Sequence, residues 1–131
     1  MKIRANVEML GIPATIVSAN LPQGTSVKIT ADETVDKATA NTLTIGEVRK
    51  CHELANKKGT IETPFRAIAD CKVSGGTALV AGDFCKTGAP DGTTGEDTVA
   101  KFVVGTDAET LKRGVVWKGA ANGGTATILL Y

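Results

Sequence analysis

Residues 21–28 read Leu-Pro-Gln-Gly-Thr-Ser-Val-Lys, and residues 79–86 read Leu-Val-Ala-Gly-Asp-Phe-Cys-Lys. In both stretches a leucine is followed after two residues by glycine, and after two more by a small apolar residue and a lysine. Glycine suits a tight turn because it adopts positive φ angles without steric cost. An apolar residue beside a lysine suits a strand with one buried and one exposed face. The pattern therefore predicts, at two places in the chain, a turn that leads into a strand.

The similarity between the two stretches continues along the chain in the same order. The matching segments are Thr34–Lys37 with Thr98–Lys101, Thr42–Lys50 with Thr110–Lys118, and Lys58–Ile61 with Gly123–Ala126. These matches predict an internal pseudo-repeat that covers residues 21–63 and 79–131, with Pro64–Gly76 as the bridge between the copies. Chance similarity is the alternative, because Gly, Thr and Lys are frequent in this chain.

Short runs rich in Val, Ile and Thr alternate with Gly, Asn, Asp and Pro, which is typical of strands and turns. The predicted strands are Ile3–Met9, Ala14–Val17, Ser26–Thr30, Val35–Ala38, Ile45–Cys51, Gly59–Ile61, Phe65–Lys72, Phe84–Lys86, Val99–Val104, Gly114–Trp117 and Thr125–Leu130. Leu43–Lys58 and Asp107–Lys112 contain helix formers, and a helical turn is an alternative in each. The sequence predicts a mainly β fold with little or no helix. We expect one β domain over residues 1–131, in which two similar β units pack face to face as a small sandwich or close as a barrel.

The composition is that of an ordinary globular domain. The chain has 131 residues, of which 42% are hydrophobic and 22% charged, and its net charge is +1. Nucleic-acid binding relies on clustered Lys and Arg side chains, whereas the basic residues here are scattered. No apolar run approaches the length of roughly 20 residues that a membrane-spanning helix needs. We therefore expect neither a nucleic-acid partner nor a membrane segment.

The residue types that carry catalysis or bind metals are few and dispersed. Cys51, Cys71 and Cys85 form no closely spaced pair, and His52 is the single histidine. Zinc sites need several thiolates or imidazoles close together, and nucleophilic catalysis needs a base beside the nucleophile. We expect no catalytic residue, metal ligand or cofactor, and we interpret the cysteines as free thiols in a reducing compartment.

About two-thirds of the chain, mainly the part from Gly59 to the end, resembles the head-decoration, or capsid cement, proteins of tailed bacteriophages. The resemblance rests on the apolar strand Phe65–Ala69, on Gly76-Thr-Ala-Leu-Val-Ala-Gly82 before a strand that ends in lysine, and on the closing segment Gly114–Leu130. The segment around Leu21–Ile29 fits the same pattern. Lys50–Lys58 and the long Gly88–Asp97 loop depart from it.

This resemblance implies a compact, tulip-like β-barrel or sandwich and a structural role without enzymatic activity, cofactor or nucleic-acid contact. It implies a location in the virion, on the outer surface of the capsid, after synthesis in the cytoplasm of the host bacterium. The expected partners are the major capsid protein and further copies of the chain, as a trimer or another small homo-oligomer. Met1, Lys2, Ile3 and Arg4 could add a strand to a shell protein or a neighbouring subunit, or form an ordinary edge strand within the fold.

Two other functional classes remain as alternatives. A non-catalytic β-sandwich module for carbohydrate binding or adhesion would need an exposed aromatic platform, for which Trp117 and Tyr131 are candidates. A small enzyme on an all-β scaffold would need a catalytic group, and the single His52 and the dispersed carboxylates argue against it.

Overall fold

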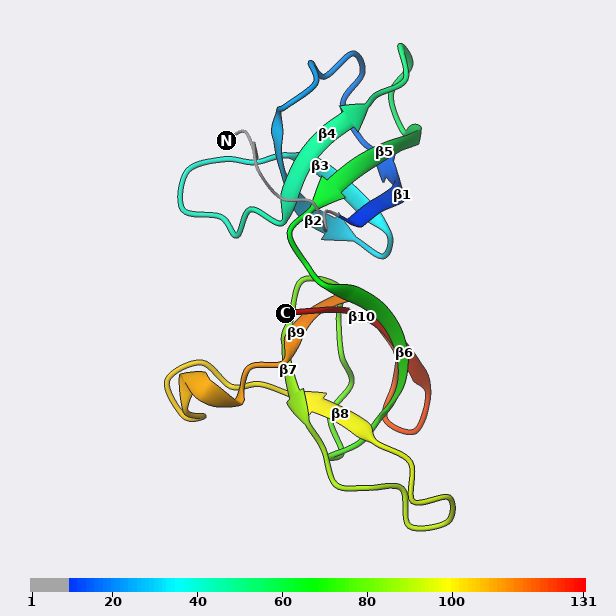
Figure 1. Cartoon of the computed structure of the whole chain (residues 1–131), viewed down its shortest axis with the longest axis vertical. Coiled ribbons are helices and arrows are strands. Elements are labelled where there is room, and N and C mark those ends of the chain that lie inside the picture. Colours follow the sequence, from blue (N-terminus) through cyan, green and yellow to red (C-terminus); the bar gives the residue numbers. More distant parts are fainter. Residues whose placement is uncertain (1–9) are drawn as a thin grey trace. The chain divides into compact units, whose positions relative to one another are not determined.

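The computed structural model describes residues 10–131. The chain divides into two compact units, and the boundary along the sequence falls between Arg66 and Ala67. Each unit is a barrel of five strands that closes on itself (Figure 1). The strands of unit 1 are β1 (Leu10–Ile16), β2 (Ser26–Ala31), β3 (Thr34–Lys37), β4 (Gly46–Lys50) and β5 (Lys57–Thr63). The strands of unit 2 are β6 (Ala67–Val73), β7 (Phe84–Thr87), β8 (Thr98–Lys101), β9 (Gly114–Lys118) and β10 (Thr125–Leu130).

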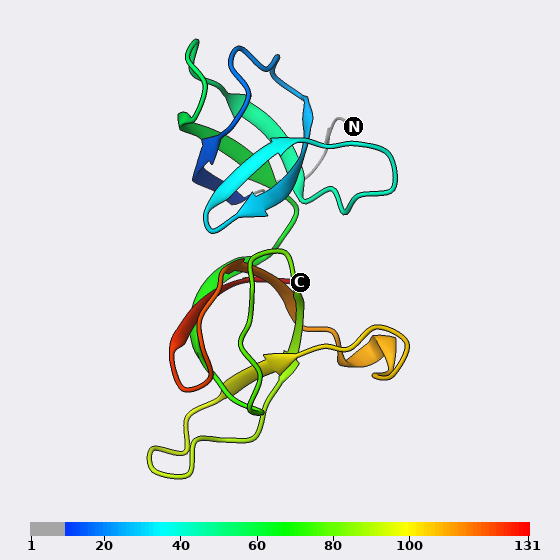
Figure 2. The same cartoon turned by 180° about the vertical axis from the view of Figure 1, so that it is seen from behind.

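The two barrels have the same topology. Around unit 1 the strands follow the order β1-β3-β2-β4-β5, and around unit 2 they follow the equivalent order β6-β8-β7-β9-β10. In each barrel the first strand pairs in parallel with the third strand and antiparallel with the fifth, which closes the ring (Figure 2). The expectation of a mainly β fold built from two similar units is confirmed, and the closed barrel is the form that each unit takes.

The repeated turn and strand of the sequence pattern have equivalent places in both barrels. Gly24 and Gly82 both have positive φ angles, of 88° and 93°. The N–H of Gly24 donates to the carbonyl of Val48, and that of Gly82 donates to the carbonyl of Val116, each at 2.8 Å. The same turn therefore connects the entry of the second strand to the fourth strand in both units.

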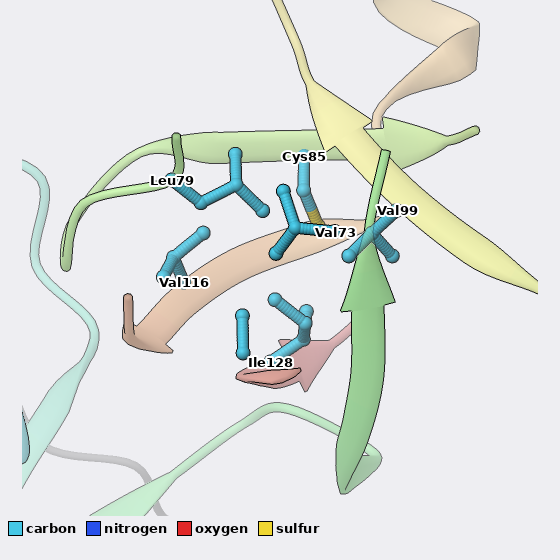
Figure 3. Close-up of a cluster of buried hydrophobic side chains, with 7 residues drawn as sticks. Val73, Leu79, Cys85, Val99, Val116 and Ile128 are labelled. Carbon is cyan, nitrogen blue, oxygen red and sulfur yellow. The ribbon is translucent and has the colours of Figure 1, made fainter. Parts of the chain in front are cut away.

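The cores are built from the inward-facing positions of the strands. In unit 2 the residues Val73, Leu79, Cys85, Val99, Val116, Ala126 and Ile128 form one buried cluster, and their side chains converge inside the barrel (Figure 3). In unit 1 the residues Ile16, Val27, Val35, Val48 and Ile61 are buried at the equivalent strand positions. Each such aliphatic side chain contributes roughly 1.5–3 kcal/mol relative to an exposed one. Two small cores therefore stabilise the chain, one in each barrel.

The structure corrects several predicted boundaries. Each strand of the two barrels overlaps one predicted strand, and the remaining prediction, Ile3–Met9, lies outside the described residues. The prediction for Val99–Val104 was too long, because β8 ends at Lys101. Leu43–Lys58 contains no helix, whereas Asp107–Lys112 does contain one 3₁₀ turn, Glu109–Leu111.

The matching of the last repeated segment was wrong by two residues. Val48 pairs with Ile61, and its equivalent Val116 pairs with Ile128. Lys58–Ile61 therefore corresponds to Thr125–Ile128 and not to Gly123–Ala126. Pro64–Gly76, predicted as a bridge, contains β6, so most of this segment belongs to the second barrel. The structural repeat also includes β1 and β6, which precede the predicted bounds at residues 21 and 79.

Within residues 10–131, no helix has the length and apolar composition that crossing a bilayer requires.

Candidate functional site

Each barrel extends a long loop between its third and fourth strands. We call residues 38–45 the first arm and residues 102–113 the second arm; the second arm, which includes the 3₁₀ turn, stands away from the barrel in Figure 1 (orange). Both arms start and end on equivalent hydrogen bonds. The N–H of Ala38 donates to Ser26 and that of Ile45 donates to Val27, while in unit 2 the N–H of Phe102 donates to Phe84 and that of Arg113 donates to Cys85; these four bonds measure 2.8–3.0 Å. The arms are therefore the same element of the two barrels, at different lengths.

The lysine of the repeated sequence pattern holds the arm in both units. Lys28 Nζ lies 3.2 Å from Thr39 Oγ1 in the first arm. Lys86 Nζ lies 2.7 Å from Asp107 Oδ1 in the second arm. Thr39 is held further by Thr42, whose hydroxyl donates to the Thr39 carbonyl at 2.6 Å and accepts the Thr39 N–H at 3.1 Å. The lysine that ends the repeated sequence pattern therefore contacts the arm in both units.

Asp107 organises the second arm from within. Its Oδ2 accepts the N–H of Val103 at 2.7 Å, while its Oδ1 accepts the ammonium group of Lys86. The N–H groups of Thr106 and Asp107 both donate to the carbonyl of Val103. The hydrogen bond from Lys86, followed by that from Val103, holds the pKa of the Asp107 carboxyl below its usual value. The carboxylate is therefore charged at neutral pH and fixes the shape of the arm.

The return segment of the second arm packs on two aromatic rings. Lys112 Nζ lies 4.1 Å from the ring centroid of Phe84 and 5.2 Å from that of Phe102. The two rings meet edge to face, with centroids 6.3 Å apart. Lys112 also pairs with Glu109 at 2.7 Å. Cation–π contacts of this kind contribute roughly 0.5–1 kcal/mol at exposed sites. The second arm is thus ordered by side-chain contacts along its whole length.

Both arms expose large apolar side chains. Leu43 on the first arm is 42% exposed, and Leu111 on the second arm is 52% exposed. Val103 and Val104, also on the second arm, are exposed as well. Ordered loops with exposed apolar side chains are common binding elements, because little conformational entropy is lost when a partner covers them.

A hollow of about 320 Å³ lies between the second arm and the end of β7. The residues that line it are Lys86, Thr87, Thr110, Leu111, Lys112 and Arg113. Arg113 Nη1 donates to Thr87 Oγ1 at 3.1 Å, and this is a contact to a neutral group. Lys86 and Lys112 are each paired with a carboxylate of the arm, Asp107 and Glu109. The hollow therefore combines cationic and hydroxyl donors with one exposed leucine.

A second hollow, of about 370 Å³, lies beside the β7–β8 loop and is lined by residues that include Lys72, Ser74, Asp91 and Asn122. Asp91 pairs with Lys72 and accepts the N–H groups of Thr93 and Thr94. The Lys72 bond, followed by these backbone bonds, holds the pKa of Asp91 well below its usual range. The carboxylate is thus occupied within its own loop, and this hollow offers no unpaired ionic group from Asp91.

The structure places the other candidate residues apart from the arms. Met1, Lys2, Ile3 and Arg4 lie outside the described residues. His52 is exposed, and its Nδ1 accepts the N–H of Leu54. No group of three or more His, Cys, Asp or Glu side chains in residues 10–131 is arranged to hold a metal ion.

The three cysteines are free thiols, and Cys85 lies in the core of unit 2. Burial raises the pKa of the Cys85 thiol to about 11. Trp117, the candidate for an aromatic platform, is only 3% exposed. The tryptophan is therefore part of the packed protein, and Tyr131 is the exposed aromatic residue of the described chain.

Sequence reasoning did not identify the arms or the hollow as a site. The signals were present, because the repeated lysine and the Thr-Leu pairs Thr42-Leu43 and Thr110-Leu111 were matched between the halves. The sequence alone did not show that each lysine contacts a loop, because these contacts join residues that are 11 and 21 positions apart.

Comparison with known proteins adds no relative: no family model matches the chain, and no curated protein matches it significantly.

Proposed function

We propose that this protein is a structural binding protein that decorates the outer surface of a bacteriophage head and stabilises the shell without catalysing a reaction. One structural observation carries the proposal: two barrels of one topology each display an ordered, apolar arm at the same place. The barrel fold also agrees with the fold that the resemblance to capsid cement proteins implies. The proposed location is the virion surface, and the proposed main partner is the major capsid protein.

The repeated arm suits attachment to a repetitive surface. A shell presents many identical sites, and linking two modest contacts raises the total affinity through effective concentration. Exposed leucines on ordered loops can each supply one such contact. We further propose that the protein self-associates on the shell as a trimer or another small homo-oligomer, since symmetric shells favour symmetric clusters.

The test uses expanded heads that lack the protein, mixed with purified protein and separated by sedimentation. We expect the protein to sediment with the heads and to raise their resistance to heat or chelators. Leu43→Ser and Leu111→Ser should each weaken binding by about tenfold or more, and the double variant should abolish it, because the two contacts act together. Leu54→Ser is the matched control, because Leu54 is 56% exposed and lies on neither arm.

Two results would contradict this proposal. One is heads that bind no added protein. The other is equal binding by the double arm variant and the Leu54→Ser control. Sedimentation equilibrium of the free and head-bound protein tests the oligomer separately, and a strictly monomeric bound form would remove that part of the proposal.

A carbohydrate-binding or adhesion module is the second class. The burial of Trp117 removes the aromatic side chain on which it relied most, and no other observation in the described chain favours it.

A further inference from the structure

We propose that the hollow beside the second arm is a recognition site for an acidic side chain, Asp or Glu, flanked by an apolar residue in a segment of a protein partner. The inference deepens the proposed function, because it rests on the arms as docking elements and specifies the chemistry that this one recognises. It concerns the site lined by Lys86, Thr87, Thr110, Leu111, Lys112 and Arg113.

The charge of the hollow suits a single carboxylate. Three cationic side chains line it, and two of these, Lys86 and Lys112, are already paired with Asp107 and Glu109. The guanidinium of Arg113 meets the neutral hydroxyl of Thr87, and none of the ion pairs within residues 10–131 joins it to an Asp or Glu side chain. Among the Lys, Arg, Asp and Glu side chains at this hollow, one positive charge therefore remains uncompensated. A monoanionic carboxylate balances it, whereas a polyanion such as nucleic acid needs several uncompensated cations.

The donors of the hollow have capacity left for such a ligand. A guanidinium carries five N–H donors, and the described contacts of Arg113 use one of them. Thr87 accepts this bond through its oxygen, so its own hydroxyl proton is available to donate. Arginine and carboxylate groups form paired, charge-assisted hydrogen bonds, which are about twice as strong as neutral ones.

Leu111 defines the neighbour of the carboxylate. Its side chain lines the hollow and is half exposed, so an apolar side chain of the partner can cover it while the acid reaches Arg113. Covering this leucine removes apolar surface from water and so adds to the affinity. The arm around it is held by Asp107 and Lys86, which limits the entropy lost on binding. The combination selects an acidic residue next to Leu, Ile or Val.

The experiment is a titration of the isotope-labelled full chain with acetyl-Leu-Glu-Leu-amide, followed by amide NMR shifts. We expect millimolar binding, with shifts at Thr87, Leu111 and Arg113, and little response to acetyl-Leu-Gln-Leu-amide. Arg113→Gln should weaken binding of the Glu peptide at least tenfold, and Thr87→Val should weaken it by a smaller factor. Lys118→Gln, an exposed lysine of β9 outside the hollow, is the matched control and should bind like the wild type. Binding should weaken as salt rises from about 50 to about 300 mM, since the contact is partly exposed.

Three outcomes would overturn the inference: equal binding of the Glu and Gln peptides, wild-type binding by Arg113→Gln, or inorganic phosphate that shifts the same amides at lower concentration than the Glu peptide. The NMR spectrum of each variant shows whether it is folded. The titration needs no heads, so the two proposals fail separately. Peptide binding through Arg113 without head binding contradicts the proposed function alone, and head binding without peptide binding contradicts the acidic site alone.

Discussion

Gly46 and Gly114 begin the fourth strand of each barrel, and both lie against the backbone of the fifth strand. A Cβ atom at Gly46 would overlap the carbonyl oxygen of Glu62, and one at Gly114 would overlap that of Leu129. These oxygens belong to paired strands and cannot move without breaking the register. The matching of Gly46 with Gly114 in the sequence thus reflects a contact that only glycine allows.

We predict that Gly46→Ala and Gly114→Ala each lower the free energy of unfolding by at least about 2 kcal/mol, because overpacking against fixed backbone is costly. Urea unfolding followed by circular dichroism measures this change. Gly92→Ala is the control, because Gly92 has open space around it and no positive φ angle; its effect should stay within about 0.5 kcal/mol. Equal effects of the three substitutions would contradict the steric explanation.

Cys85 illustrates a difference between the two cores at a single position. Val27 takes the equivalent place in unit 1, and both side chains are fully buried. Because burial raises the pKa of Cys85 to about 11, the thiol stays protonated in the folded protein at pH values where the unfolded thiol, with a pKa of about 8.5, ionises. The unfolded state is then favoured as the pH rises through this window.

The substitution Cys85→Val should therefore remove the part of the decrease in the free energy of unfolding at alkaline pH that comes from this thiol. Between about pH 8.5 and 11 the thiol lowers the free energy of unfolding by up to about 1.4 kcal/mol per pH unit. Urea unfolding at about pH 8 and about pH 10 compares the two proteins, and the wild type should lose more stability between them. An identical pH dependence of both proteins would show that Cys85 does not titrate on unfolding.

The arms show how one side chain can shape an element. In the second arm the carboxylate of Asp107 joins the loop backbone at Val103 to the strand lysine Lys86. In the first arm the hydroxyl groups of Thr39 and Thr42 replace that carboxylate. The two loops thus bind the lysine of the second strand through different polar groups, a threonine hydroxyl in the first arm and a carboxylate in the second.

Asp107→Ala should loosen the second arm while the barrel stays folded. We expect faster hydrogen exchange at the amides of Val103, Thr106 and Lys112, and little change in the free energy of global unfolding, since the ion pair is partly exposed. The amide of Val116, which lies in the barrel, is the internal reference.

The same carboxylate predicts a pH response of the arm. The pKa of Asp107 is lower in the folded protein than in the unfolded chain. Its stabilisation is therefore complete above the unfolded value of about 3.9 and is lost as the pH falls through the lower folded value. The protection of the Val103 amide against exchange, relative to an unstructured amide at the same pH, should persist at mildly acidic pH and fall only in stronger acid. An arm that loosens already at about pH 5 would contradict this assignment.

At the level of elements, the sequence was most informative where apolar and polar residues alternate. It was less informative in two places. Val103 and Val104 were assigned to a strand because they are apolar, but they lie on the arm, where Asp107 closes a local turn. The start of β1 was missed because Gly11 and Pro13 normally interrupt strands. Pro13 is accommodated because only β5 pairs with β1 at that position.

At the scale of the molecule, each barrel has its own closed hydrogen-bonded ring and its own core. We therefore predict that the two units unfold as separate cooperative units. Native-state hydrogen exchange should show that Gly46→Ala lowers the protection of amides in residues 10–63 much more than that of amides in residues 67–130. Gly114→Ala should give the reverse pattern. Equal loss of protection in both units would show that the chain behaves as one cooperative unit.

The whole-molecule features that could be predicted from sequence were the ones that repeat. Matching of Gly24 with Gly82, and of Gly46 with Gly114, identified two similar units without any knowledge of strand pairing. The closure of each ring could not be predicted this way, because it joins the first strand of each unit to the fifth and depends on register. The final matched segment shows the limit: Gly59-Thr60 was matched with Gly124-Thr125 by residue type, whereas strand pairing makes Ile61 equivalent to Ile128.

The pairing of β1 with β5, and of β6 with β10, also sets an order of events during synthesis. Neither ring can close until its last strand is available, so the first barrel can complete its fold once Thr63 has left the ribosome, while the second is still being translated. Such end-to-end pairing is slow compared with local structure. Folding one ring before the other appears keeps two similar sets of strands from competing for the same partners.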